Sequence, residues 1–196
     1  MTPEEVHQMG LHELQKLKHG VRKVQQQLGK RHLTMTEFAQ WVRDEPSQSF
    51  SSSDELMTHI EDLIFKRINP RMDQVLPKSL ISNTTTMVNI VPYTNGLASY
   101  NPGSMDGSRP GSFNLNLEGF ADFRKFELLS LTLHEANPGH NFNAAFMSGT
   151  DVPNFLKYAP YRRLSSIPSN FPIYTAYEEG WGLYAESLGY DMGLYR

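Results

Sequence analysis

The sequence lacks cysteine, and it has no large excess of either charge. With no cysteine among 196 residues, a disulfide framework, a thiol nucleophile and a cysteine-bound metal are excluded. Eighteen Lys and Arg residues stand against 21 Asp and Glu residues, which gives a net charge of −3. We therefore expect no nucleic-acid partner, because phosphate binding depends on clustered positive charge. Any bound metal must be held by His, Asp and Glu.

Long hydrophobic runs are missing as well. No apolar run approaches the length that spans a bilayer, so we expect no integral membrane segment. The first residues, Met1 to Glu5, are polar and acidic, unlike a secretory signal peptide. The sequence carries no signal for a particular compartment or oligomeric state. Apolar residues make up 39% and aromatic residues 11%, which is enough to build a hydrophobic core.

Residues 1–82 are expected to form an N-terminal helical part. Thr2 and Glu5 have the spacing of a capping box before a helix that ends at Gly29. A shorter helix is expected over residues 37–44, and a third begins after Ser52 and is broken or kinked at Pro70. Apolar residues recur at three- and four-residue steps, which predicts faces packed in the core: Val6, Leu14, Leu17, Val21, Val24, Leu28, Phe38, Trp41, Val42, Leu56, Ile60, Leu63, Ile64 and Ile68.

Residues 83–118 form a strand and loop region in our interpretation. Residues 87–91 and 113–117 favour strands, and the segment between them is rich in turn residues. One interpretation is a surface hairpin that supports the helices. The other is an exposed edge strand over residues 112–117, beside a cleft, to which an extended peptide adds. Three residues of this region are candidates for substrate contact: Arg109, Asn114 and Asn116.

Residues 119–196 are expected to hold metal-site helices. An apolar helix over residues 127–134 runs into His134-Glu135-Ala136-Asn137-Pro138-Gly139-His140. In the familiar zinc helix, two His residues four positions apart lie on one face. Six positions turn an ideal helix by about 600°, so His134 and His140 could not both face a metal on an unbroken helix. Pro138 and Gly139 can interrupt it, and the motif therefore predicts a helix broken at its own site.

A second segment, residues 177–186, supplies the third ligand. Glu178 and Glu179 project about 100° apart on a helix, so one of them points at a given metal. We take Glu179 as the ligand and Glu178 as an acid favoured by the helix N-terminus. Glu186 lies two turns beyond Glu179 on the same face, where it could hydrogen-bond a ligand imidazole.

These parts together predict the chemistry of a zinc hydrolase. Two neutral imidazoles and one carboxylate leave one Zn²⁺ ion with a net charge of +1 and an open position for water. Glu135 could take the proton of that water and pass it to a leaving amine. The candidates for the oxyanion partner are three tyrosines near the third ligand: Tyr174, Tyr177 and Tyr184.

Over nearly its whole length the chain resembles the domain-of-unknown-function family 885, which is grouped with the gluzincin-type zinc metallopeptidases. The resemblance implies that His134, His140 and Glu179 bind zinc, that Glu135 is the catalytic acid/base, and that the substrate is a peptide. It also implies a zincin-like helical metallopeptidase architecture. The residues that carry it are Thr2 to His7, Gly10-Leu11, Asp106 to Gly111, Asn116, His134-Glu135, Pro138 to His140, Glu179 to Trp181 and Leu183 to Glu186.

The chain departs from the family at two positions and in its length. Asn141 stands where members often have His, and Gly182 where they often have Ala. Family proteins are several hundred residues long, so we expect this chain to be the central part of a larger protein and the architecture to be incomplete. We expect an incomplete chain to be poorly soluble, oligomeric or dependent on zinc for folding, with little activity.

The fold class that follows is mostly α with a small β element, an α+β arrangement. The favoured function is a zinc-dependent peptidase or its core. An alternative is a non-catalytic helical binding or scaffold protein that retains a degenerate metal motif. A further alternative is a zinc hydrolase of a non-peptide amide or ester. Stoichiometric zinc would separate the two hydrolases from the scaffold.

Overall fold

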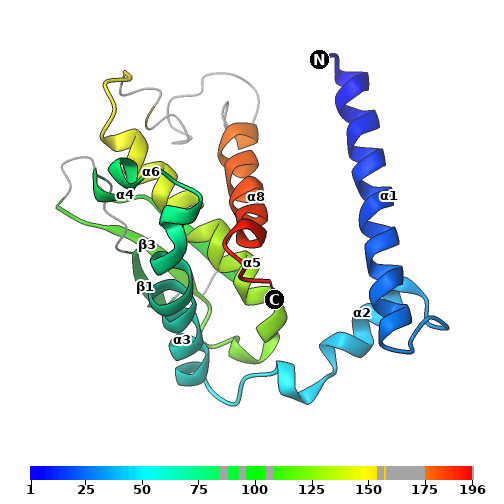
Figure 1. Cartoon of the computed structure of the whole chain (residues 1–196). Helices are drawn as coiled ribbons and strands as arrows, with labels where there is room; N and C mark the ends of the chain where they lie inside the picture. The colour runs from blue at the N-terminus through cyan, green and yellow to red at the C-terminus, as the bar shows by residue number, and fades with distance from the viewer. Residues whose placement is uncertain (84–87, 93–95, 105–107, 154–156, 158–174, 196) are drawn as a thin grey trace, which may run out of the picture. The chain divides into compact units, whose positions relative to one another are not determined.

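The structure is a computed structural model that describes residues 1–83, 88–92, 96–104, 108–153, 157 and 175–195 (Figure 1). It divides into two compact units, Met1–Gln48 and Ser49–Arg196. Helices dominate, and three short strands form one sheet, which confirms the expected α+β class. No helix in the described ranges is both long and apolar enough to cross a lipid bilayer.

The first unit consists of two capped helices and a short 3₁₀ turn. Helix α1 (Pro3–Gln27) begins at the predicted capping box, in which the Glu5 N–H donates to Thr2 Oγ1 and the Thr2 N–H donates to Glu5 Oε2. Helix α2 (Met35–Arg43) has a second capping box. The turn η1 (Pro46–Gln48) closes the unit. The predicted start and end of the first helix are therefore confirmed.

The predicted burial of the first helix is wrong. Leu17 is 68% exposed and Val6 is 53% exposed, and other members of the stripe are exposed too. The described side chains of this unit contribute two buried residues, Gln25 and Phe38. Two helices and a turn offer too little surface to cover a 25-residue helix, so its periodicity shows amphipathic character without burial. The exposed members of the stripe are Val6, Leu14, Leu17, Val24 and Leu28.

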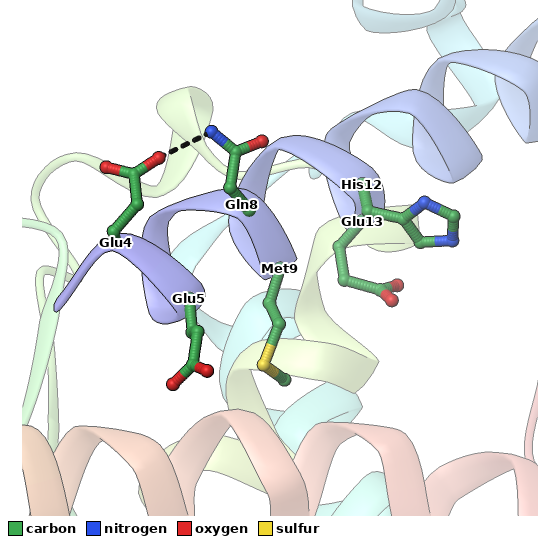
Figure 2. A pocket seen from close by; sticks show the side chains of 6 residues that line it. All are labelled: Glu4, Glu5, Gln8, Met9, His12 and Glu13. Atoms are coloured by element: carbon green, nitrogen blue, oxygen red, sulfur yellow. Dashed lines mark hydrogen bonds between the residues drawn. The ribbon is translucent and has the colours of Figure 1, made fainter. Parts of the chain in front are cut away.

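A hollow of about 470 Å³ lies along the first turns of α1 (Figure 2). Its lining side chains all come from this one helix, and among them the Gln8 amide donates a hydrogen bond to Glu4. None of the sequence-predicted site residues is among them, so the hollow is a feature of the helix surface. The lining residues are Glu4, Glu5, Gln8, Met9, His12 and Glu13.

The second unit begins with a helix that changes its geometry. Helix α3 (Ser53–Glu61) is capped by Ser52, whose Oγ accepts from the Glu55 N–H. The chain then forms a π-helical segment, η2 (Asp62–Ile68), and a 3₁₀ segment, η3 (Asn69–Gln74), followed by α4 (Lys78–Asn83). The α-helical geometry therefore ends earlier than the predicted break at Pro70, because a wider π turn precedes the proline.

A three-stranded sheet follows, with the order β1-β3-β2. Strand β1 (Val88–Pro92) runs parallel to β3 (Gly111–Leu115), and β2 (Ala98–Asn101) runs antiparallel to β3. The predicted edge strand is therefore wrong: β3 is paired on both sides, and the Asn116 N–H donates to the Leu97 carbonyl. After the turn-rich segment the chain enters the sheet as β3, between β1 and β2. Both edges of β3 are therefore occupied, and an extended peptide cannot add to it.

Four helical segments in the described residues follow the sheet. They are η4 (Phe120–Asp122), α5 (Lys125–Glu135), α6 (His140–Ser148) and α8 (Thr175–Asp191). Helix α5 packs against α8 and η2, and α6 packs against α8 and β3 (Figure 1). The core of the unit lies among these elements: Leu56, Ile60, Leu63, Ile64, Ile68, Phe113, Leu115, Leu128, Leu133, Leu188 and Met192.

Candidate metal centre

The helix that carries His134 is interrupted, as the motif predicts. Helix α5 ends at Glu135 and α6 begins at His140, with residues 136–139 between them. The Ala136 carbonyl accepts the N–H of Asn141, so the two helices are joined by a tight connection. His134 therefore lies in the last turn of one helix and His140 at the first position of the next. The break lets two imidazoles six positions apart face the same point.

Gly139 is required by the closeness of this connection. A Cβ atom at position 139 would collide with the carbonyl oxygens of Leu133 and His134. These are backbone atoms, which cannot turn aside as the end of a side chain can. The Gly of the motif thus allows the chain to return across the end of α5.

Glu179 completes a group of three side chains that could hold a metal ion. Its Oε2 lies 3.2 Å from His134 Nε2 and 3.9 Å from His140 Nε2. The three candidate ligand atoms all lie within 4.8 Å of one another. The imidazole planes stand at 88° with ring centroids 4.7 Å apart, so the nitrogens approach one point from different directions. Glu179 comes from α8, about forty residues after the two histidines.

Glu186 lies behind His134, in the position that its spacing suggests. A hydrogen bond of 2.9 Å links His134 Nδ1 and Glu186 Oε1. Ser130 Oγ donates to the other carboxylate oxygen at 3.2 Å. A carboxylate that accepts the Nδ1–H of a histidine leaves the Nε2 atom to bind a metal, and His134 Nε2 is the atom that faces Glu179 at 3.2 Å.

Helix α8 approaches the His134 imidazole closely at Gly182. A Cβ atom there would lie 2.5 Å from His134 Cε1. The ring is held by Glu186 on one side and lies against Glu179 on the other, so it has little room to move. The glycine at this position leaves space for the ring.

Glu135 and His140 both have shifted protonation equilibria. Burial raises the pKa of the Glu135 carboxyl, His134 lowers it and the charge of Glu179 raises it further. Burial also lowers the pKa of His140, as does His134, while Glu179 acts in the opposite direction. Both shifts favour the neutral form of the group. A neutral imidazole is the form that binds metals.

Glu178 lies outside the group of three. It is half-buried, and its pKa is raised by burial and then by the charge of Glu179. Glu179 is 55% exposed by its side chain and reaches both imidazoles. Of the two adjacent acids, the structure therefore brings Glu179 to the histidines.

The two tyrosine candidates for an oxyanion partner that the structure describes do not approach His134, His140 and Glu179. Tyr177 and Tyr184 are more than half exposed. At 100° per residue both lie on the side of α8 opposite Glu179 and Glu186. Tyr174 falls outside the described residues.

The three candidates of the sheet region have structural contacts. Arg109 donates to the carbonyls of Pro102 and Pro110 and so holds the turn before β3. Asn114 is buried and donates to Ser99 Oγ across the sheet. Asn116 Oδ1 accepts from the Gly119 N–H. None of these contacts reaches the two histidines.

The sequence interpretation missed several residues around the cluster. The Tyr100 ring of β2 stacks on the His140 imidazole, with centroids 6.3 Å apart. The Trp181 indole N–H donates to the Pro138 carbonyl at 2.8 Å. Asn137 and Asn141 are buried and hydrogen-bonded to each other. The place of the two asparagines in and next to the His134–His140 motif is a local signal in the sequence, whereas Tyr100 gives none.

The donor set and its spacing fit a zinc ion. Zinc holds His nitrogen and carboxylate oxygen at about 2.0–2.2 Å, so two tetrahedral ligands lie about 3–4 Å apart. The two distances from Glu179 fall in this range, and the bound of 4.8 Å on all three pairs lies just above it. The fold and the cluster thus define an α+β protein with a possible metal site of two His and one Glu.

The chain belongs to the family described as bacterial protein of unknown function (DUF885), whose profile matches residues 1–196. It is similar to a crystal structure described as "the putative lipoprotein from Colwellia psychrerythraea", with a TM-score of 0.79 and 25% identity. The match covers 100% of this chain and 32% of that one, so this chain spans about a third of the Colwellia protein. No curated protein matches the sequence.

Proposed function

We propose that the chain binds one zinc ion through His134, His140 and Glu179 and forms the metal centre of a zinc-dependent peptidase. The observation that carries this proposal is the convergence of three ligand atoms within 4.8 Å from segments far apart in the sequence. Glu186 and Ser130 support it, because Glu186 contacts the Nδ1 atom of His134, Ser130 contacts Glu186, and the Nε2 atom of His134 is left on the side of the cluster.

Glu135 supplies the acid/base chemistry in this proposal. When bound in such a site, zinc lowers the pKa of water and polarises a carbonyl group. The Glu135 carboxylate takes a proton from the attacking water and returns it to the leaving amine nitrogen. Its place next to a ligand in a half-buried position supports the role, since burial and the charge of Glu179 raise its pKa, although His134 lowers it.

The sheet supports a peptide as the substrate. Among the described strands, β1 and β2 form the edges, and β2 pairs with β3 alone. Tyr100 of β2 stacks on His140, so this strand lies beside the proposed metal site. An extended peptide that adds to β2 by main-chain hydrogen bonds would pass the two histidines. This neighbourhood favours a peptide over a non-peptide amide or ester.

The test is a metal analysis of the purified chain. We expect about one zinc per chain by mass spectrometry after dialysis, and a loss of most of it in each of the variants His134→Ala, His140→Ala and Glu179→Ala. The matched control is His32→Ala, an exposed histidine of the first unit, which should leave the zinc content unchanged. Full occupancy in His140→Ala would contradict the proposed site. A chain without stoichiometric zinc would favour the scaffold alternative.

A further inference from the structure

The distance between the two histidines depends on the buried connection between α5 and α6. His134 precedes this connection and His140 follows it, so any shift of residues 136–139 moves one imidazole against the other. Ala136 and Asn137 have no exposed surface, and Asn141 at the start of α6 is 2% exposed. A buried connection that carries amide side chains must satisfy their hydrogen bonds within the protein.

The amides of this connection form a relay that runs in one direction. Asn141 Nδ2 donates to Asn137 Oδ1 at 3.0 Å, and Asn137 Nδ2 donates to Asn69 Oδ1 at 2.9 Å. Asn69 opens the segment η3, 68 residues before Asn137 in the sequence. The relay therefore ties the connection to an element that takes no part in the metal cluster.

Tyr100 closes the other end of the relay. Its hydroxyl donates to Asn141 Oδ1 at 3.2 Å, so the amide oxygen and the amide nitrogen of Asn141 both have partners. The same residue stacks its ring on the His140 imidazole at an interplanar angle of 29°. Tyr100 thus contacts the proposed ligand His140 through its ring and hydrogen-bonds Asn141 through its hydroxyl.

We propose that Asn69, Asn137, Asn141 and Tyr100 act as positioning residues that set the metal affinity of the centre. This inference rests on the proposed function, because it concerns the same three ligands. Each bond of the relay fixes one part of the connection: η3 holds Asn137, Asn137 holds the start of α6, and β2 holds Asn141. Ligands held in place before the metal arrives lose little freedom on binding, which is how such partners raise affinity.

The sharpest test is a pair of substitutions at Asn69, because this residue lies outside the cluster and its connection. Asn69→Leu removes the acceptor for the Asn137 amide, whereas Asn69→Asp keeps an acceptor oxygen in the same place. Loss of a residue that hydrogen-bonds a metal ligand directly weakens binding about 10- to 100-fold. Asn69 acts through Asn137, so we expect Asn69→Leu to weaken zinc binding about 10-fold, the lower end of that range. Asn69→Asp should restore most of the affinity.

Tyr100→Phe gives a second test that deletes a single hydroxyl group. It keeps the ring on His140 and removes the hydrogen bond to Asn141. We expect a weakening of zinc binding of about 10-fold. If Asn69→Leu fails to fold, this smaller change tests the same relay.

Zinc affinity is measured on the full chain by competition with a chromophoric chelator, and cobalt absorption reports the ligand geometry. The control for general destabilisation is Phe50→Ala, a buried core residue whose ring contacts are with His59 and Lys125. It should lower the melting temperature and leave zinc affinity and the cobalt spectrum unchanged.

The outcomes separate the two proposals. Weak zinc binding in Asn69→Leu and Tyr100→Phe, with recovery in Asn69→Asp and an altered cobalt spectrum, supports the relay. Wild-type affinity in both variants, or an equal loss in Phe50→Ala, overturns the relay and leaves the metal site standing. A wild-type chain that binds neither zinc nor cobalt overturns the proposed function and the relay with it.

Discussion

Helix α1 and the interrupted pair α5 and α6 are held in opposite ways. Helix α1 is continuous over 25 residues, its caps are formed by its own neighbours, and most of its stripe is exposed. The pair α5 and α6 breaks after 11 residues, and its connection is held by Asn69, Trp181 and Tyr100 from three other elements. The first helix depends on local contacts and the second pair on distant ones.

This difference explains where chemistry is found in the chain. A helix held by local contacts places side chains at the fixed angles of its own axis. An interrupted helix can bring His134 and His140 to one point, but only when other elements hold the break in place. The elements around α5 and α6 therefore hold the geometry of His134, His140 and Glu179, and under the proposed function substitutions there should act on metal binding and catalysis.

Among the substitutions that test this difference between α1 and the pair α5 and α6, we expect the largest effect at Glu135. In the full-length protein, Glu135→Gln keeps the size of the side chain and removes its ability to accept a proton, so the proposed peptide hydrolysis should fall about 10²- to 10⁴-fold. The zinc content should remain unchanged, because Glu135 is not among the three ligand atoms. The measurement is the rate of cleavage of a fluorogenic peptide mixture, with zinc determined on the same sample.

Glu178→Gln is the matched control for this prediction. Glu178 is also half-buried with a raised pKa, but it lies outside the group of three. Hydrolysis should persist in this variant. Loss of activity in Glu178→Gln with retention in Glu135→Gln would assign the base to α8 instead of α5.

The next effect concerns the close return of the chain at Gly139. Gly139→Ala places a Cβ against the carbonyl oxygens of Leu133 and His134, and overpacking of this kind costs about 3 kcal/mol of unfolding free energy. The connection should also open, so zinc affinity should fall. Urea denaturation and chelator competition measure the two effects. An unchanged unfolding free energy would show that the backbone at the end of α5 can move aside for a Cβ atom. The connection between α5 and α6 would then not be tightly held, and it would no longer differ from α1 in this respect.

The sequence was enough to predict those features that rest on neighbouring residues. The capping box at Thr2, the strand over Val88–Pro92 and the interruption after Glu135 all follow from residues within one or two turns. The approach of Glu179 to the histidines could be expected because few ligand types are possible in a chain without cysteine. The candidate ligands therefore follow from the residue types that can bind a metal, and the periodicity of the helices contributed less to their choice.

The features that could not be predicted depend on contacts between distant segments. An alternating strand reads the same at an edge or in the centre of a sheet, and the partners of β3 decide which it is. An apolar stripe shows that a helix is amphipathic, but the exposure of Leu17 depends on what surrounds it. Asn69 and Tyr100 are far in sequence from Asn137 and Asn141, and the fold brings them into contact, so no local pattern marks them.

The smallest effect is expected at Gly20, in the interior of α1. A Cβ atom at this position would meet nothing within 4 Å, in contrast to Gly139. Glycine lowers helix stability relative to alanine by about 0.5–1 kcal/mol, because it loses more backbone freedom on folding. Gly20→Ala should therefore stabilise α1, with slower hydrogen exchange of its amides by mass spectrometry. Zinc affinity should not change. A destabilised α1 in this variant would mean that another segment packs against Gly20, and the helix would then depend on distant contacts as α5 and α6 do.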